Sequence, residues 1–123
     1  MNDFEYTTPQ TLREAVKLLA EKGEDARVLA GGTDLIVQLR GRRFQPERVV
    51  DVKKIAELNE LSFSARKGLR IGAAVPCHRI YKDAEVVERF PGIVDSAMII
   101  GGIQIQGRAT LGGNLCNASP SAD

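Results

Sequence analysis

The stretch ARVLAGGTDL, residues 26–35, decides the fold. Its first five residues predict a short β-strand, and Gly31-Gly32 interrupts it. Thr33 and Asp34 are favourable N-cap residues, so we expect a helix over 35–40 that Gly41 closes. The next strand is expected at RVVDV, residues 48–52. Strand, helix and strand in this order predict a parallel βαβ unit.

A helix is expected before this unit. Thr11 and Glu14 have the spacing of a capping box, which marks the beginning of a helix. Apolar side chains then recur on one face of a helix of about three turns. Gly23 is expected to end this helix.

The chain then changes character. Residues 62–65 and 69–73 flank a turn and predict an antiparallel hairpin. A small parallel unit followed by an antiparallel one gives an α+β fold. We therefore expect two subdomains, a first over residues 1–56 and a second over 57–123.

Helices and short β-like pieces are expected after the hairpin. Pro76 begins a helical stretch that continues to residue 89, and Pro91 begins another. The tail that follows is rich in glycine and polar residues. It contains apolar pieces at 103–105 and 109–111, for which we expect a β-like conformation.

Composition excludes several classes of function. The 123 residues include 17 Lys and Arg against 16 Asp and Glu, so the formal net charge is +1. Such a balance predicts no nucleic-acid binding. No apolar run approaches the ~20 residues of a membrane span, and the N-terminus does not resemble a secretory signal, so we expect a cytoplasmic protein.

Few side chains suggest catalysis. His78 is the only histidine and is expected at the surface, so no metal cluster or Ser-His-Asp arrangement can be built. Cys77 and Cys116 lack the C-x-x-C spacing of a metal or redox motif and are expected to be small buried or half-buried residues. The arginines from Arg40 to Arg48 are expected to form a solvated basic face.

Glycine is concentrated in two loops, which are the candidates for ligand binding. AGGTD, residues 30–34, lies between a strand and a helix, and TLGGN occupies 110–114. Backbone N–H groups in such loops can converge on an anion, and glycine permits close approach of a phosphate to the backbone. Two such loops suit a diphosphate, although each could also be only a turn. The spacing matches neither the Rossmann fingerprint nor a Walker loop.

Together the two loops resemble the FAD-binding subunit of the molybdenum hydroxylases, the family of xanthine dehydrogenase and of the medium subunit of carbon monoxide dehydrogenase. The resemblance rests on VLAGGTDL at 28–35, TLGGN at 110–114 and ASPSAD at 118–123, and FEY at 4–6 is also similar. It implies a FAD-binding domain of the PCMH/vanillyl-alcohol-oxidase-like type. Family members are longer, so we expect an N-terminal part whose second subdomain is incomplete.

The resemblance also implies which residues hold FAD. Backbone amides of both loops bind the diphosphate in the family, Asp123 matches an acidic residue that contacts the cofactor, and Ile100 matches a position close to the flavin. No catalytic or metal-binding residue is expected in this chain. The expected cofactor-binding residues are Val28, Leu29, Ala30, Gly31, Gly32, Thr33, Asp34, Leu35, Ile100, Thr110, Leu111, Gly112, Gly113, Asn114 and Asp123.

Partners follow from the same resemblance. A large subunit would carry molybdopterin, a small subunit would carry 2Fe-2S clusters, and the flavin would pass electrons from these clusters to NAD or another acceptor. The chain alone is not expected to be active. An alternative from another class is a non-catalytic α+β interaction module whose glycines only form turns. Retention of flavin on purification would separate the two.

Overall fold

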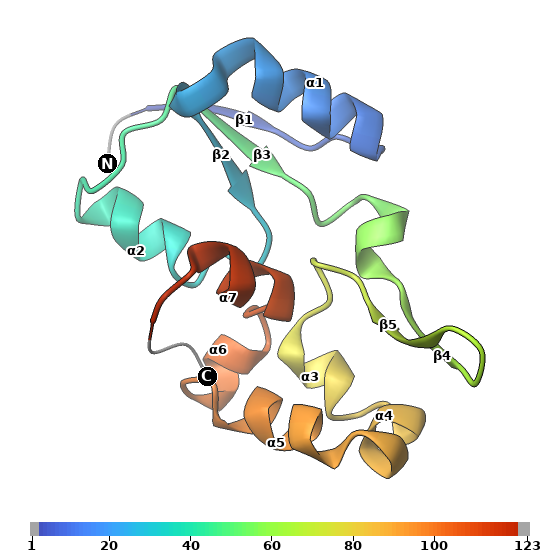
Figure 1. The fold of residues 1–123 in the computed structure, drawn as a ribbon. Helices are drawn as coiled ribbons and strands as arrows, with labels where there is room; N and C mark the ends of the chain where they lie inside the picture. The colour runs from blue at the N-terminus through green and yellow to red at the C-terminus, as the bar shows by residue number, and fades with distance from the viewer. Residues whose placement is uncertain (1–2, 121–123) are drawn as a thin grey trace.

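The computed structural model describes residues 3–120, and a parallel β-sheet occupies the first half of them (Figure 1). The elements of this half are β1 (Glu5–Thr7), α1 (Leu12–Lys22), the 3-10 helix η1 (Gly23–Asp25), β2 (Ala26–Leu29), α2 (Leu35–Arg40) and β3 (Arg48–Asp51). The strand order is β1-β3-β2, and β3 pairs in parallel with both neighbours. The predicted parallel βαβ unit is therefore confirmed as β2-α2-β3. The three-residue strand β1 was not predicted.

The centre of this sheet is buried. All four residues of β3 are buried, as expected for the central strand of a sheet. Val50 and Ile55 are completely inaccessible and pack in one cluster with Ala15 of α1. α1 therefore covers the sheet through one apolar face, and its opposite face is left to solvent.

The beginning of α1 confirms the predicted capping box. The Thr11 hydroxyl accepts the backbone N–H of Glu14 at 3.2 Å, and the Glu14 carboxylate accepts the backbone N–H of Gln10 at 2.9 Å. Gly23 ends the helix with a φ of 53°, a backbone conformation that residues other than glycine rarely adopt. Both ends of α1 are thus determined by local residues.

The second half combines a hairpin with short helices. Its elements are the 3-10 helix η2 (Ala56–Asn59), β4 (Leu61–Ser64), β5 (Gly68–Ile71), α3 (Cys77–Ile80), α4 (Ala84–Arg89), α5 (Pro91–Ile99), α6 (Ile103–Gln106) and α7 (Leu111–Asn117). β4 and β5 pair antiparallel, so the predicted hairpin is confirmed. A second core cluster, which includes Val75, Ile80 and Ala97, joins α3, α4 and α5. None of the helices among residues 3–120 has the length and apolar character needed to cross a bilayer.

Three expectations about this half are wrong. Residues 103–105 are helical, because the carbonyl of Gly102 accepts the backbone N–H of Gln106 at 3.0 Å and closes the turn of α6. Of the piece at 109–111, only Thr110 makes a β-bridge, with Pro76, and α7 begins at the next residue. The stretch after Pro76 is divided, because the Asp83 carboxylate caps a new helix, α4. Short apolar runs do not distinguish strand from helix.

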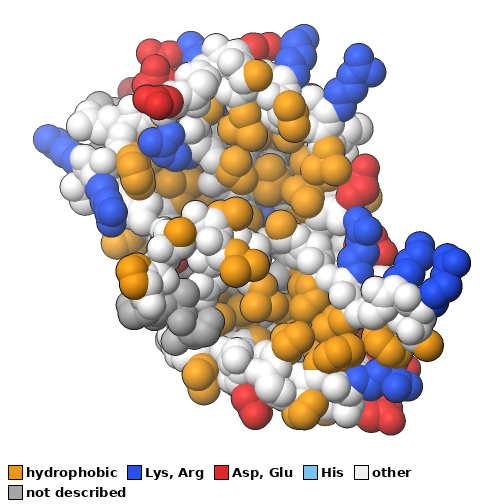
Figure 2. Space-filling view, viewed as in Figure 1, with side chains coloured by type: hydrophobic (Ala, Val, Ile, Leu, Met, Phe, Trp, Pro, Cys, Tyr) orange, Lys and Arg blue, Asp and Glu red, His pale blue; other side chains and the backbone are white. Residues whose placement is uncertain are grey.

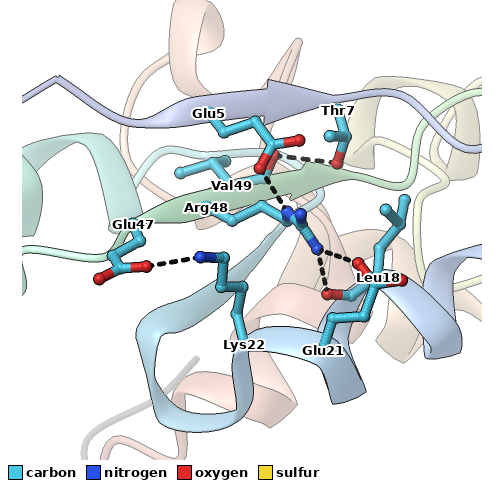
Figure 3. A network of polar contacts seen from close by, with 8 residues as sticks. All are labelled: Glu5, Thr7, Leu18, Glu21, Lys22, Glu47, Arg48 and Val49. Atoms are coloured by element: carbon cyan, nitrogen blue, oxygen red, sulfur yellow. Dashed lines mark hydrogen bonds and ion pairs between the residues drawn. The ribbon is translucent and has the colours of Figure 1, made fainter.

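Arg48 is the largest departure from the expected solvated basic face. It is only 8% exposed, and its guanidinium bonds Glu5 of β1 and Glu21 of α1, each at 2.8 Å (Figure 3). It also donates to the carbonyl of Leu18 at 2.9 Å. One side chain on β3 therefore ties the neighbouring strand and the covering helix together. The hydrogen bond from Arg48 holds the pKa of Glu21 below its usual value.

Replacing Arg48 with Met is expected to lower the urea midpoint of unfolding, because the Leu18 carbonyl loses its donor and α1 loses its link to β1. The pKa of Glu21 should rise toward its usual value in the variant, as an NMR titration of the side-chain carboxyl would show. Arg66→Met, in the exposed hairpin turn, is the control and should leave both quantities unchanged. An unchanged Glu21 pKa in Arg48→Met would contradict the network.

Asp51 at the end of β3 gives a pH dependence of stability. Burial alone raises the pKa of Asp51, but hydrogen bonds from Lys53 and from the Tyr6 hydroxyl hold it below the usual value. A lowered carboxyl pKa stabilises the folded state above the unfolded pKa of about 3.9, and this contribution is lost as the pH falls through the folded pKa. Asp51→Asn should therefore be less stable than wild type at pH 7, with a difference that shrinks below about pH 4. Urea unfolding across this range measures it, and a constant difference would count against the assignment.

Candidate functional site

The two glycine loops, far apart in the sequence, line one cleft. Its volume is about 610 Å³, and its walls include residues 30–35 on one side and Thr110 and residues 112–114 on the other. The first loop connects β2 to α2, and the second begins α7, which lies between the sheet and the helices of the second half (Figure 1). The fold therefore places both loops at one locus, which the sequence could only suggest.

A direct backbone contact holds the loops together. A Cβ on Gly31 would collide with the backbone carbonyl of Arg108 and lie 3.1 Å from the Cα of Ala109. Gly112 has a similar constraint, because a Cβ there would lie 2.6 Å from the Cα of Ala73. Real Cβ atoms do not approach this closely, so any other residue at either position would push the segments apart. These glycines are needed for the packing of the chain on itself.

Gly32 is required by the turn of the first loop. Its φ is +80°, and a Cβ there would lie 2.7 Å from Leu29 Cδ1 and 3.3 Å from Ile36 Cδ1. Any other residue would be held at a disfavoured backbone angle, so a Gly32 substitution would disturb the loop before it tested ligand binding. That the missing Cβ also leaves room for a phosphate stays a prediction.

The first loop offers hydrogen-bond donors to the cleft. Among the described residues, the backbone N–H groups of residues 31–34 donate to no protein acceptor. All four residues line the cleft. Residues 31–33 are half-buried and Asp34 is exposed, so these amides are open to the cleft and can converge on an acceptor-rich ligand.

Asp34 does not cap α2 with its side chain, contrary to expectation. Its backbone is already helical, with φ −90° and ψ −47°, whereas a capping residue needs an extended backbone to turn its carboxylate toward the helix. The Thr33 side chain does not cap α2 either. Asp34 is exposed and stands beside the free amides.

The second loop is ordered by Thr110. Its hydroxyl accepts the backbone N–H of Gly113 at 2.9 Å and so begins α7. Across the cleft, the side-chain amide of Gln38 in α2 donates to Asn117 Oδ1 in α7 at 3.4 Å. This contact joins the helices that follow the two loops.

Most of the expected cofactor-binding residues line this cleft. Ile100 lines it from the end of α5, where it is 9% exposed and also belongs to the second core cluster. Leu29 and Leu111 are half-buried and do not line it. Asp123 lies outside the described residues. The expected residues on the cleft wall are Val28, Ala30, Gly31, Gly32, Thr33, Asp34, Leu35, Ile100, Thr110, Gly112, Gly113 and Asn114.

Other wall residues were not predicted. The apolar face of α1 contributes Leu12 and Val16, which are 43% and 64% exposed. Phe44 closes another part of the wall, with the guanidinium of Arg27 at 4.6 Å from its ring centroid and that of Arg43 at 5.8 Å. In Figure 2 hydrophobic side chains gather across the centre of the face, while most charged side chains lie around its rim. The sequence signal for Leu12 and Val16 was the apolar face of α1, which extends beyond the buried part at Ala15.

No group of three or more His, Cys, Asp and Glu side chains within 3–120 could hold a metal. Cys77 is buried, as expected, and burial raises the pKa of its thiol, but Cys116 is exposed and lines the first cleft from α7. His78 is half-buried rather than at the surface, because α3 packs against α5, and its Nδ1 has no partner among the described residues.

Comparison with known proteins agrees with this geometry. Residues 2–123 match the family described as the FAD binding domain in molybdopterin dehydrogenase. The chain is 37% identical over 124 residues to the xanthine dehydrogenase FAD-binding subunit of Escherichia coli O157:H7, covering 100% of this chain and 42% of that protein. It is 33% identical to the carbon monoxide dehydrogenase medium chain of Hydrogenophaga pseudoflava, covering 98% and 42%.

Solved structures give the same result. Quinoline 2-oxidoreductase from Pseudomonas putida 86 superimposes with a TM-score of 0.92 at 34% identity, and Cu,Mo-CO dehydrogenase with a TM-score of 0.94 at 34% identity. In both comparisons 99% of this chain matches 42% of the other. The chain thus spans less than half the length of these relatives, and the expected α+β fold of a FAD-binding domain is confirmed.

Fold and site together define a nucleotide-cofactor domain built on two glycine loops. The chain belongs to the family of FAD-binding domains of molybdopterin dehydrogenases. The residues present fit the cofactor, because free backbone amides and an apolar wall face the same cleft. In the second loop, the N–H groups of Gly113 and Asn114 already donate to Thr110, at 2.9 Å to its hydroxyl and at 3.0 Å to its carbonyl.

Thr110→Val should lower the free energy of unfolding by about 1 kcal/mol, because the methyl group that replaces the hydroxyl cannot accept the N–H of Gly113. Thr110→Ser keeps the acceptor and is the matched control. Urea unfolding followed by circular dichroism measures both variants. Equal midpoints for Val and Ser would show that the cap does not order the second loop.

Proposed function

We propose that the chain binds FAD between its two glycine loops and serves as the flavin-carrying part of a molybdenum hydroxylase. The observation that carries this proposal is the meeting of both loops at one cleft whose first loop has free amides. The family match and the resemblance to xanthine and carbon monoxide dehydrogenase subunits support it. When bound, FAD would supply a two-electron carrier that can also exchange single electrons.

The residues of this chain would bind and orient the cofactor. The amides of residues 31–34, which donate to no acceptor among the described residues, would donate hydrogen bonds to the charged phosphate oxygens. Thr110 fixes the second loop opposite them. Val16, Phe44 and Ile100 supply apolar wall and exclude water from the parts of the ligand that are not phosphate.

The electron path is part of the proposal. A small subunit with 2Fe-2S clusters would deliver electrons to the flavin from a large subunit with molybdopterin, and NAD or another acceptor would remove them. Substrate oxidation would then take place on another polypeptide. The subdomain boundary after residue 56 and the cytoplasmic location remain predictions.

A charge introduced between the loops tests the FAD site. Gln38→Glu would place a carboxylate beside the diphosphate, since Gln38 lines the cleft and contacts Asn117 on the opposite helix. FAD affinity should fall roughly tenfold or more, because like charges a few ångströms apart repel by kilocalories even at an effective dielectric of about 20. Titration followed by flavin fluorescence and visible absorbance gives the affinities.

Gln104→Glu is the matched control, because Gln104 is exposed on α6 and lines neither of the two clefts described. It should bind FAD as wild type does. Equal affinities for the two variants would place the diphosphate elsewhere. Failure of the wild-type chain to bind FAD would overturn the proposal and favour the interaction module.

A further inference from the structure

A second cleft lies directly behind the first. Its volume is about 370 Å³, and none of its lining residues is acidic. Three pairs of adjacent residues separate the two clefts. Val52, Ala73 and Ala109 line the first cleft, and their chain neighbours Lys53, Ala74 and Arg108 line the second. The lining residues are Lys53, Asn59, Ala74, Pro76, Arg79, Gly107 and Arg108.

Three cationic residues are among those that line this second cleft. Lys53 forms an ion pair with Asp51 at 2.7 Å, and Asp51, 4% exposed, also accepts the Tyr6 hydroxyl and the backbone N–H of Lys53. Asp51 is therefore saturated and can offset one positive charge. Lys53, Arg79 and Arg108 leave an excess of two positive charges around the cleft, in a chain whose formal net charge is +1.

The two guanidinium groups keep free donors. Arg79 uses one N–H to reach the backbone carbonyl of Asn59 at 3.1 Å, which fixes its position and leaves its other donors. The side chain of Arg108 has no hydrogen-bond or ion-pair partner within residues 3–120. Elsewhere in the fold, Arg48, Arg70 and Arg89 are each paired with glutamate. The arginines of the second cleft are not neutralised in this way.

We propose that the second cleft binds a phosphate-bearing anion, either free phosphate or diphosphate or the phosphate group of a nucleotide. Phosphate oxygens accept hydrogen bonds from both kinds of cation. A guanidinium group can donate two parallel N–H bonds, and an ammonium group acts as a compact positive charge. The absence of a lining carboxylate removes the repulsion such a ligand would otherwise meet. The cleft is smaller than the first, which suits a diphosphate or a mononucleotide better than FAD.

Calorimetric titration of the full chain with pyrophosphate, at constant low ionic strength, tests the site. Arg108→Gln removes an exposed, unpaired side chain and should leave the fold intact while weakening binding about tenfold, the usual value of a charge-assisted contact to phosphate. The double variant Arg79→Gln/Arg108→Gln should lose binding further. Arg13→Gln/Arg66→Gln removes two exposed arginines that line neither cleft and should stay within twofold of wild type.

Pyrophosphate could also enter the first cleft, so the titration is repeated in Gln38→Glu. Binding that survives this change and is lost in Arg108→Gln belongs to the second cleft, whether or not the chain binds FAD. Binding lost in Gln38→Glu and kept in Arg108→Gln would overturn the proposal, as would equal losses in the two double variants. Titration with AMP and with inorganic phosphate separates the sources: tighter AMP binding supports a nucleotide, and equal binding supports the free anion.

Discussion

The architecture depends on the close approach of two backbone segments, one at Gly31 and one at Arg108 and Ala109. Because no side chain separates them, the loop that follows β2 and the segment that precedes α7 meet in direct backbone contact. Residues of this contact line both clefts: Gly31 and Ala109 line the first, and Arg108 lines the second. Gly112 makes a second close contact of this kind, with the backbone of Ala73.

The surroundings hold this contact in place without taking part in it. Arg48 fixes α1 to the sheet, and the buried β3 aligns β2 so that its carboxyl end delivers the first loop. Thr110 orders the second loop at the beginning of α7. The cleft therefore combines backbone amides of the first loop with an apolar wall of side chains such as Val16, Phe44 and Ile100.

Local rules predicted the elements whose ends are set by nearby residues. The capping box at Thr11 gave α1, the turn between 62–65 and 69–73 gave the hairpin, and the glycine turn gave the βαβ unit. The burial of Arg48 could not be predicted in this way, because it depends on carboxylates that reach it from two other elements. Residues 103–105 are a different failure: their helical turn closes locally on Gly102, but a short apolar run does not distinguish strand from helix.

The site shows the same division. The two loops were found from glycine content and family resemblance, but their glycines were explained by space for a phosphate, whereas Gly31 and Gly112 are required by segments far away in the chain. Phe44 and Arg43 carry no pattern of their own and became part of the cleft only through folding. Short sequence motifs predict where a loop lies in the chain, and tertiary contacts determine which other residues the loop faces.

The separation of the two loops has a kinetic consequence. Gly31 and Arg108 are more than seventy residues apart, so the contact between them closes most of the chain into one loop. Contacts of such long sequence separation form late and are entropically costly to close. The cleft does not exist in any partly folded form that lacks this closure. A ligand held by both loops therefore adds its binding free energy to the closed state alone and slows its opening.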